Sequence, residues 1–153
     1  VGLSLAALVL LMLPLLFLPF AKRRRTAVRR AEVDPELRAL GAWQEMIDRA
    51  ADSKVKVPAA ASRSQIAEAL GTDAARWAGS TVDRAVFSAQ GLTEQDADWM
   101  WAAADADRLE REARLTRGQR LRASYALRSY GVNIVKWRAG AAESAAASQN
   151  EER

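Results

Sequence analysis

Residues 34–52 read Asp-Pro-Glu-Leu-Arg-Ala-Leu-Gly-Ala-Trp-Gln-Glu-Met-Ile-Asp-Arg-Ala-Ala-Asp, and this stretch indicates the fold class. Asp34 followed by Pro35 is typical of a helix N-cap with proline at the first helical position. Apolar residues then recur at spacings of three and four from Leu37 to Ala50, which is the period of an amphipathic helix. We therefore expect one helix from residue 35 to about residue 52.

Three more helix starts follow along the chain. Ser62 and Gln65 have the spacing of a capping box, in which each side chain satisfies the other residue's backbone N–H. Asp73 and Thr93 are suited to cap two further helices, and glycines follow at the expected helix ends. Strand signals are nearly absent, so the sequence predicts an all-α fold, a small bundle of short helices.

The chain contains five tryptophans, and their positions predict different roles for them. Trp43, Trp77 and Trp101 fall on apolar helix faces, which favours packing in the core. Trp99 lies two positions before Trp101 and therefore on a different face of the same helix. It is the best candidate for a contact outside the core.

Residues 1–20 carry no charged side chain. Twenty helical residues extend about 30 Å, the thickness of a bilayer's hydrocarbon core, so we expect a transmembrane helix that ends near Pro19. The basic residues that follow at once are Lys22, Arg23, Arg24, Arg25, Arg29 and Arg30. By the positive-inside rule they predict a plasma-membrane protein with its N-terminus outside and the rest of the chain cytoplasmic. A cleaved signal peptide is disfavoured, since the basic cluster follows the apolar run instead of preceding it.

Composition narrows the chemistry. The chain has no Cys and no His, which removes thiol nucleophiles, imidazole bases, disulfides and the usual zinc sites. We expect no enzyme activity, no cofactor and no metal. The acidic residues between Glu94 and Asp107 lack the spacing of a calcium loop and are typical of a solvated helix face.

Charge is unevenly distributed around the net value of +4. Residues 21–31 hold six basic and no acidic residues, residues 32–107 hold seven basic and fourteen acidic, and residues 108–138 hold nine basic and two acidic. An acidic body thus lies between two basic stretches. Gly118 is expected to break the helix in the second of them.

The second basic stretch has three open interpretations. Its candidate contact residues are Arg120, Arg122, Tyr125, Arg128, Tyr130, Lys136, Trp137 and Arg138. A basic segment with aromatic residues on its apolar side is typical of a helix lying on anionic lipid. A solvated or protein-binding helix is equally compatible with the pattern. Nucleic-acid binding is disfavoured because no recognised module is present.

The predicted organisation has five segments. They are a transmembrane helix (1–20), a basic juxtamembrane linker (21–33), an acidic helical bundle (34–115), a basic amphipathic segment (116–138) and a disordered tail (139–153).

The order of several motifs resembles a known family. The motifs are Ala-Trp-Gln-Glu-Met-Ile-Asp at 42–48, Val-Pro at 57–58, Ser-Arg-Ser-Gln-Ile-Ala-Glu-Ala-Leu at 62–70, Val-Asp-Arg-Ala-Val-Phe-Ser at 82–88 and Thr-Glu-Gln-Asp-Ala at 93–97. Together they are similar to the C-terminal region of actinobacterial multi-spanning membrane proteins that carry a transglutaminase-like domain.

The resemblance implies a context for this chain. In that family an extracytoplasmic papain-like domain holds a Cys, a His and an Asp, and a last transmembrane helix leads to a cytoplasmic helical domain of unknown role. No catalytic residue carries over, because this chain lacks Cys and His. The implied function is a non-catalytic domain that orients or regulates the parent protein, packs beside its other transmembrane helices, or binds an unknown cytoplasmic protein. An independent single-span adaptor or a sensor of anionic lipid is the alternative.

Overall fold

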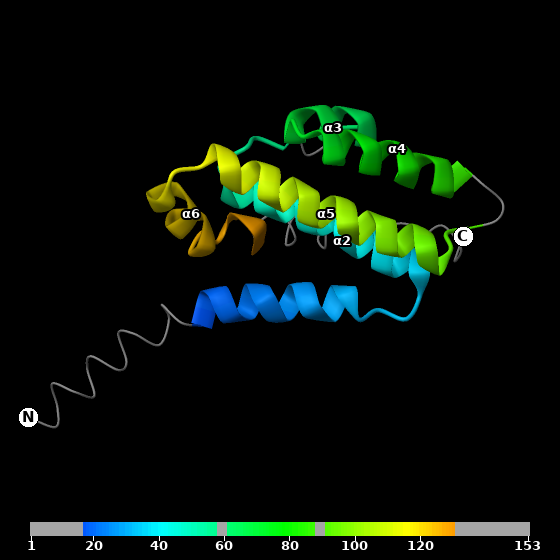
Figure 1. Ribbon diagram of the computed structural model, residues 1–153, viewed down its shortest axis with the longest axis horizontal. Helices are drawn as coiled ribbons and strands as arrows, with labels where there is room; N and C mark the ends of the chain where they lie inside the picture. Colours follow the sequence, from blue (N-terminus) through cyan, green and yellow to red (C-terminus); the bar gives the residue numbers. More distant parts are fainter. Residues whose placement is uncertain (1–16, 58–60, 88–90, 131–153) are drawn as a thin grey trace, which may run out of the picture.

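The computed structural model describes residues 17–57, 61–87 and 91–130, and within them every regular element is helical (Figure 1). A helix over residues 17–30 comes first. It is followed by α2 (Pro35–Asp52), α3 (Arg63–Leu70), α4 (Asp73–Phe87), α5 (Glu94–Arg114) and α6 (Arg117–Ser124). The all-α prediction is confirmed for these residues.

Local signals set most helix ends. Asp34 accepts hydrogen bonds from the backbone N–H groups of Glu36 and Leu37 and so caps α2, as predicted. Capping boxes open α3 at Ser62 and α5 at Thr93, also as predicted. Gly71 ends α3 with φ +72°, a left-handed conformation that glycine adopts without steric penalty.

Two helix boundaries differ from the sequence-based expectation. Thr72, not Asp73, caps α4, because its Oγ1 accepts the backbone N–H of Ala75 at 3.2 Å. Gly118 does not break a helix, since α5 ends at Arg114 and the next capping residue, Thr116, starts α6. Gly118 then lies in the first turn of α6, where its low helix propensity matters little.

The core lies where α2 and α5 pack side by side, with α3 and α4 covering them (Figure 1). It is rich in alanine, and its larger members are Trp43, Met46, Ile47, Leu70, Val82, Met100 and Trp101. Burial of Trp43 and Trp101 confirms their predicted core positions, and the Trp101 indole N–H donates to the Arg38 carbonyl at 3.1 Å. Small alanine side chains let the helices approach closely, so the bundle is thin.

Three residues expected to face inward are exposed instead. Trp77 is 42% exposed, and Leu37 and Leu40 are also exposed. On α4 the buried row is Ala75, Ala78 and Val82. Trp77 lies off the centre of this row by more than a third of a turn, since each helical residue advances about 100°.

A buried polar network ties α5 to the turn between α3 and α4. The Thr72 hydroxyl donates to the Asp107 carboxylate at 2.6 Å, and Arg111 donates to the same carboxylate at 2.7 Å. Arg111 also donates to the carbonyl of Leu70 at 3.3 Å. Because Asp107 is fully buried, its charge depends on these partners for compensation.

Two predicted segments at the chain's ends fall largely outside the described residues. The transmembrane helix expected at 1–20 enters them only from residue 17, and the tail expected at 139–153 does not enter them. Within the described ranges no helix is long and apolar enough to cross a bilayer. The segment 21–33, expected as a linker, is helical through residue 30, and Pro19 does not end that helix.

Asp107→Ala tests the buried network. Removing one partner of a buried ion pair leaves Arg111 uncompensated, so the free energy of unfolding should fall by about 3–5 kcal/mol. Chemical denaturation followed by circular dichroism measures this change. Glu112→Ala is the control, because its pair with Arg108 is exposed and should contribute less than about 1 kcal/mol. Equal losses in the two variants would contradict the assignment.

Candidate interaction surfaces

The basic residues after the apolar run divide between the inside and the outside of the bundle. Lys22, Arg25 and Arg29, here called the inner row, recur at spacings of three and four and so share one helix face. That face lies against α2. The other basic residues of the segment, Arg23, Arg24 and Arg30, are exposed.

The inner row is paired with three carboxylates of α2, Glu45, Asp48 and Asp52, here called the acidic row. Lys22 Nζ lies 2.7 Å from Asp52 Oδ2, and Arg25 Nη2 lies 3.2 Å from Asp48 Oδ2. Arg29 Nη1 is 2.8 Å from Asp48 and 3.0 Å from Glu45. The helix over 17–30 is therefore held to α2 along its length by ion pairs.

All three carboxylates of the acidic row are buried, and Asp48 is fully so. A buried carboxylate is costly unless it is paired and hydrogen-bonded. Thr26 Oγ1 donates to Glu45 at 2.8 Å, and Arg49 Nε lies 3.2 Å from the same carboxylate. Burial lowers the pKa of Arg49, while the negative charge of Glu45 acts in the opposite direction. The inner row is thus part of the fold.

Arg30 makes a separate contact with α5. Its guanidinium pairs with Asp105 and lies 4.6 Å from the ring centroid of Trp101. A cation over an indole face is attracted by the ring's quadrupole. Arg30 therefore fastens the end of the first helix to α5.

The C-terminal basic stretch meets the first helix although about one hundred residues separate them. Lys22 Nζ donates to the carbonyl of Ala123 at 2.9 Å, and the Arg25 guanidinium lies 5.0 Å from the ring centroid of Tyr130. Ser129 N–H donates to Asp52 Oδ1 at 3.0 Å. In Figure 1, α6 and the start of the first helix lie at the same end of the molecule.

This shared end carries a group of exposed residues, here called the basic end. Its members are Arg23, Arg24, Arg117, Arg120, Leu121, Arg122, Leu127 and Arg128. Within the described part of the chain, none of its arginines forms an ion pair. Phe17 and Phe20, both exposed, lie on the same helix just before Arg23. Cationic and apolar groups are therefore presented together to solvent.

The predicted contact residues have different outcomes. Arg120, Arg122 and Arg128 are exposed, whereas Tyr125 and Tyr130 are half-buried, and Tyr130 packs under Arg25. The three remaining members, Lys136, Trp137 and Arg138, lie outside the described residues. The sequence pattern indicated one contact segment at these positions. It did not indicate that this segment contacts the first basic stretch.

A second surface is an open groove between α4 and α5, here called the tryptophan groove. It is lined by Ala74, Trp77, Trp99, Ala102, Ala103 and Ala106 and has a volume of about 590 Å³. The Trp99 side chain is 52% exposed, in line with its predicted place off the core. Trp77 stands opposite on α4. Sequence reasoning missed this partner because it assigned Trp77 to the core.

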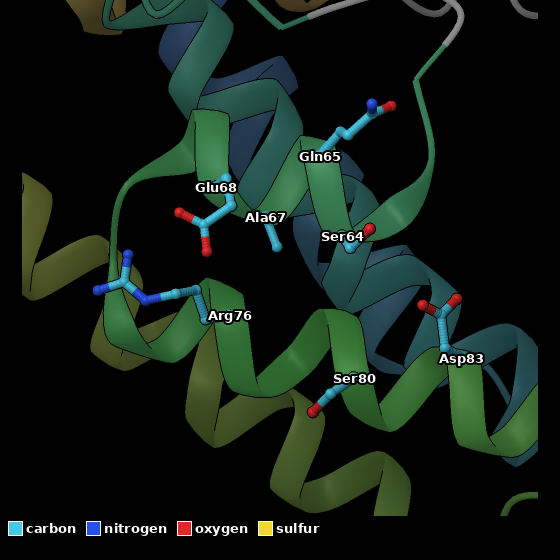
Figure 2. A pocket seen from close by; sticks show the side chains of 7 residues that line it. All are labelled: Ser64, Gln65, Ala67, Glu68, Arg76, Ser80 and Asp83. Atoms are coloured by element: carbon cyan, nitrogen blue, oxygen red, sulfur yellow. The ribbon is translucent and has the colours of Figure 1, made fainter.

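A third hollow, of about 430 Å³, lies between α3 and α4, and most of the residues that line it are polar or charged (Figure 2). Glu68 and Arg76 extend toward it from the two helices. Two of its charged side chains have ion-pair partners, since Arg76 pairs with Asp73 and Asp83 lies 3.1 Å from Arg63.

The acidic residues of α5 serve structural roles. Glu94 and Asp98 pair with Arg38, and Asp96 completes the capping box with Thr93. Within residues 17–57, 61–87 and 91–130 no group of three or more acidic side chains is arranged to hold a metal ion.

Comparison of the chain with known protein families, with curated proteins and with solved structures finds no match.

Asp48→Asn tests how the first helix is held. The substitution keeps the shape but removes the charge that compensates Arg25 and Arg29, so this helix should detach from α2 more often. Amide hydrogen exchange over residues 17–30 should accelerate about tenfold or more, corresponding to at least 1.4 kcal/mol, while α5 changes less.

Asp83→Asn is the matched control for that experiment, because the pair of Asp83 with Arg63 is partly exposed. Exchange over residues 17–30 should stay within about twofold of the parent chain in this variant. Unchanged exchange in Asp48→Asn would show that the ion pairs do not hold the first helix.

Proposed function

We propose that this chain is a non-catalytic helical domain, anchored in the plasma membrane by residues 1–20, that rests its basic end on anionic lipid. The observation that carries the proposal is the basic end itself. Two stretches of sequence that are far apart contribute exposed arginines to one end of the bundle, where the first helix begins. The apolar run of residues 1–20 joins the bundle at this same end.

The energetics favour lipid as the contact. Each basic side chain near an anionic leaflet contributes roughly 1 kcal/mol, and six arginines belong to the basic end. Leu121 and Leu127 are both exposed and can enter the headgroup region beside the arginines. The anchor keeps the domain within reach of the surface, so association needs no further loss of translational freedom.

The proposed role is orientation of the domain. The inner row and the acidic row join the first helix to α2 by ion pairs. In the proposed role this joint transmits the direction of the anchor to the bundle, and lipid contact at the basic end fixes rotation about that direction. The basic residues that follow the anchor support an orientation with the N-terminus outside and the bundle on the cytoplasmic side.

The proposal extends to a longer parent protein of the transglutaminase-like class, whose C-terminal part this chain would form. Its support is the motif order from Ala42 to Ala97 together with the absence of Cys and His from the chain. Immunoblotting of cell membranes with an antibody to residues 139–153 tests it. A band far above 16.7 kDa is expected, whereas a band near 16.7 kDa would reject a parent protein and favour an independent adaptor.

Contact with lipid is measurable at a single labelled position. The chain has no Cys, so Leu127→Cys provides one site for a polarity-sensitive dye in the full chain held in nanodiscs. Its emission should shift to the blue in discs containing phosphatidylserine but not in phosphatidylcholine alone. About 1 M salt should reverse the shift, because it shortens the screening length to about 3 Å.

Val33→Cys is the matched control for the labelling experiment. Val33 is also strongly exposed, and it belongs to the connection between the first helix and α2, which lies at the end of the first helix away from α6 (Figure 1). Its label should report the same emission in both discs. Equal emission from Leu127→Cys in neutral and anionic discs would overturn the lipid-contact proposal.

A further inference from the structure

We propose that the tryptophan groove between α4 and α5 binds a cationic amphipathic helix of a cytoplasmic partner protein. The groove uses none of the residues of the basic end. It is also on another side of α5, because Trp101 and Asp105 meet Arg30 whereas Trp99, Ala102 and Ala106 line the groove. At about 100° per residue the centres of these two sets are separated by roughly a third of a turn around the helix. A ligand in the groove therefore leaves the basic end free.

The shape of the groove suits a helix. Two indoles, one on each side, are about half exposed, and the floor consists of alanine side chains. Alanine lets a third helix approach at the close interaxial distances of about 8–10 Å seen between packed helices. Tryptophan is among the residues that contribute most to binding at protein interfaces. An apolar ridge with small and medium side chains would complete the layer.

The charged residues near the groove indicate which side chains should flank the apolar ridge of the incoming helix. On α5 the groove is lined by Trp99, Ala102, Ala103 and Ala106, and Asp98 is the chain neighbour of Trp99. The side chains of Glu94 and Asp98 are largely exposed and share one basic partner, Arg38. Asp73, beside Ala74 on α4, is also largely exposed and pairs with Arg76. Lysine or arginine on the sides of the incoming helix would meet these carboxylates.

The same charges disfavour other occupants. A second copy docked face to face would bring acidic residues of α5 against each other, which like-charge repulsion opposes. Anionic lipid is repelled for the same reason. A cationic helix from another protein meets both requirements, apolar contact and opposite charge.

The test uses two fluorescein-labelled model peptides of 18 residues and the full chain in phosphatidylcholine nanodiscs. Both peptides are amphipathic helices with the same leucine and alanine ridge, one flanked by lysine and the other by glutamate. Fluorescence anisotropy measures their affinities. The lysine peptide should bind at least about tenfold more tightly than the glutamate peptide.

Substitutions locate the binding site. Trp99→Ala and Trp77→Ala should each weaken binding of the lysine peptide about tenfold or more, since they remove the two walls of the groove. Leu37→Ala is the matched control, because it removes an exposed apolar side chain on α2 outside the groove and should change affinity less than about twofold. Because both tryptophans are about half exposed, the two variants should remain folded. Circular dichroism verifies this.

Four results would overturn the proposal. They are the absence of lysine-peptide binding, equal binding of the two peptides, unchanged affinity in Trp99→Ala, and a Trp99-dependent dimer of the chain in sedimentation. A fifth concerns the chain's own basic segment. If Lys136→Ser combined with Trp137→Ser raised the affinity about tenfold, that segment would be the occupant instead of a partner protein.

Discussion

The ion pairs between the inner row and the acidic row are the constraint on which the arrangement depends. Asp48 is fully buried and receives both Arg25 and Arg29, so neither helix can turn about its axis without exposing an uncompensated charge. Gly41 of α2 permits this contact, because a Cβ there would lie 3.1 Å from Cβ of Arg29. The position of the first helix is therefore specified by charge pairing at close range.

That pairing determines which basic residues remain for other roles. Lys22, Arg25 and Arg29 face α2, whereas Arg23 and Arg24 are left on the surface beside α6. The two interaction surfaces then differ in chemistry. The basic end combines arginine with leucine, and the tryptophan groove combines indoles with nearby carboxylates. Ligands of opposite charge can occupy the two surfaces without competing.

The sequence predicted the features that depend on neighbours along the chain. Helix caps at Asp34, Ser62 and Thr93 were found because a cap needs only residues within one turn. The ion-pair rows were missed because their match depends on how two helices face each other. Their signal was present as basic residues at 22, 25 and 29 and acidic residues at 45, 48 and 52, all at spacings of three or four.

The tryptophan groove was half predicted. Trp99 was separated from the core by comparison with Trp101, but Trp77 is surrounded by alanines on both faces of α4, so periodicity could not choose its side. Neither helix alone reveals a groove, since its walls come from different elements. The composition of the chain, without Cys or His, favoured a prediction of binding surfaces. The location of the groove follows only from the packing of α4 on α5.

The contacts that close the fold have an effect on the order of its assembly during synthesis. The first helix and α2 pair across 16 to 30 residues, so this hairpin can form once residue 52 has left the ribosome. Lys22 reaches Ala123 across 101 residues, and Arg25 reaches Ser129 across 104. At about 5–20 residues per second the later partners emerge roughly 5–20 s after the earlier ones. From its own emergence until that of Ser129, 77 residues later, Asp52 lacks the backbone N–H of Ser129, and the nascent hairpin is open at the end where α6 will dock.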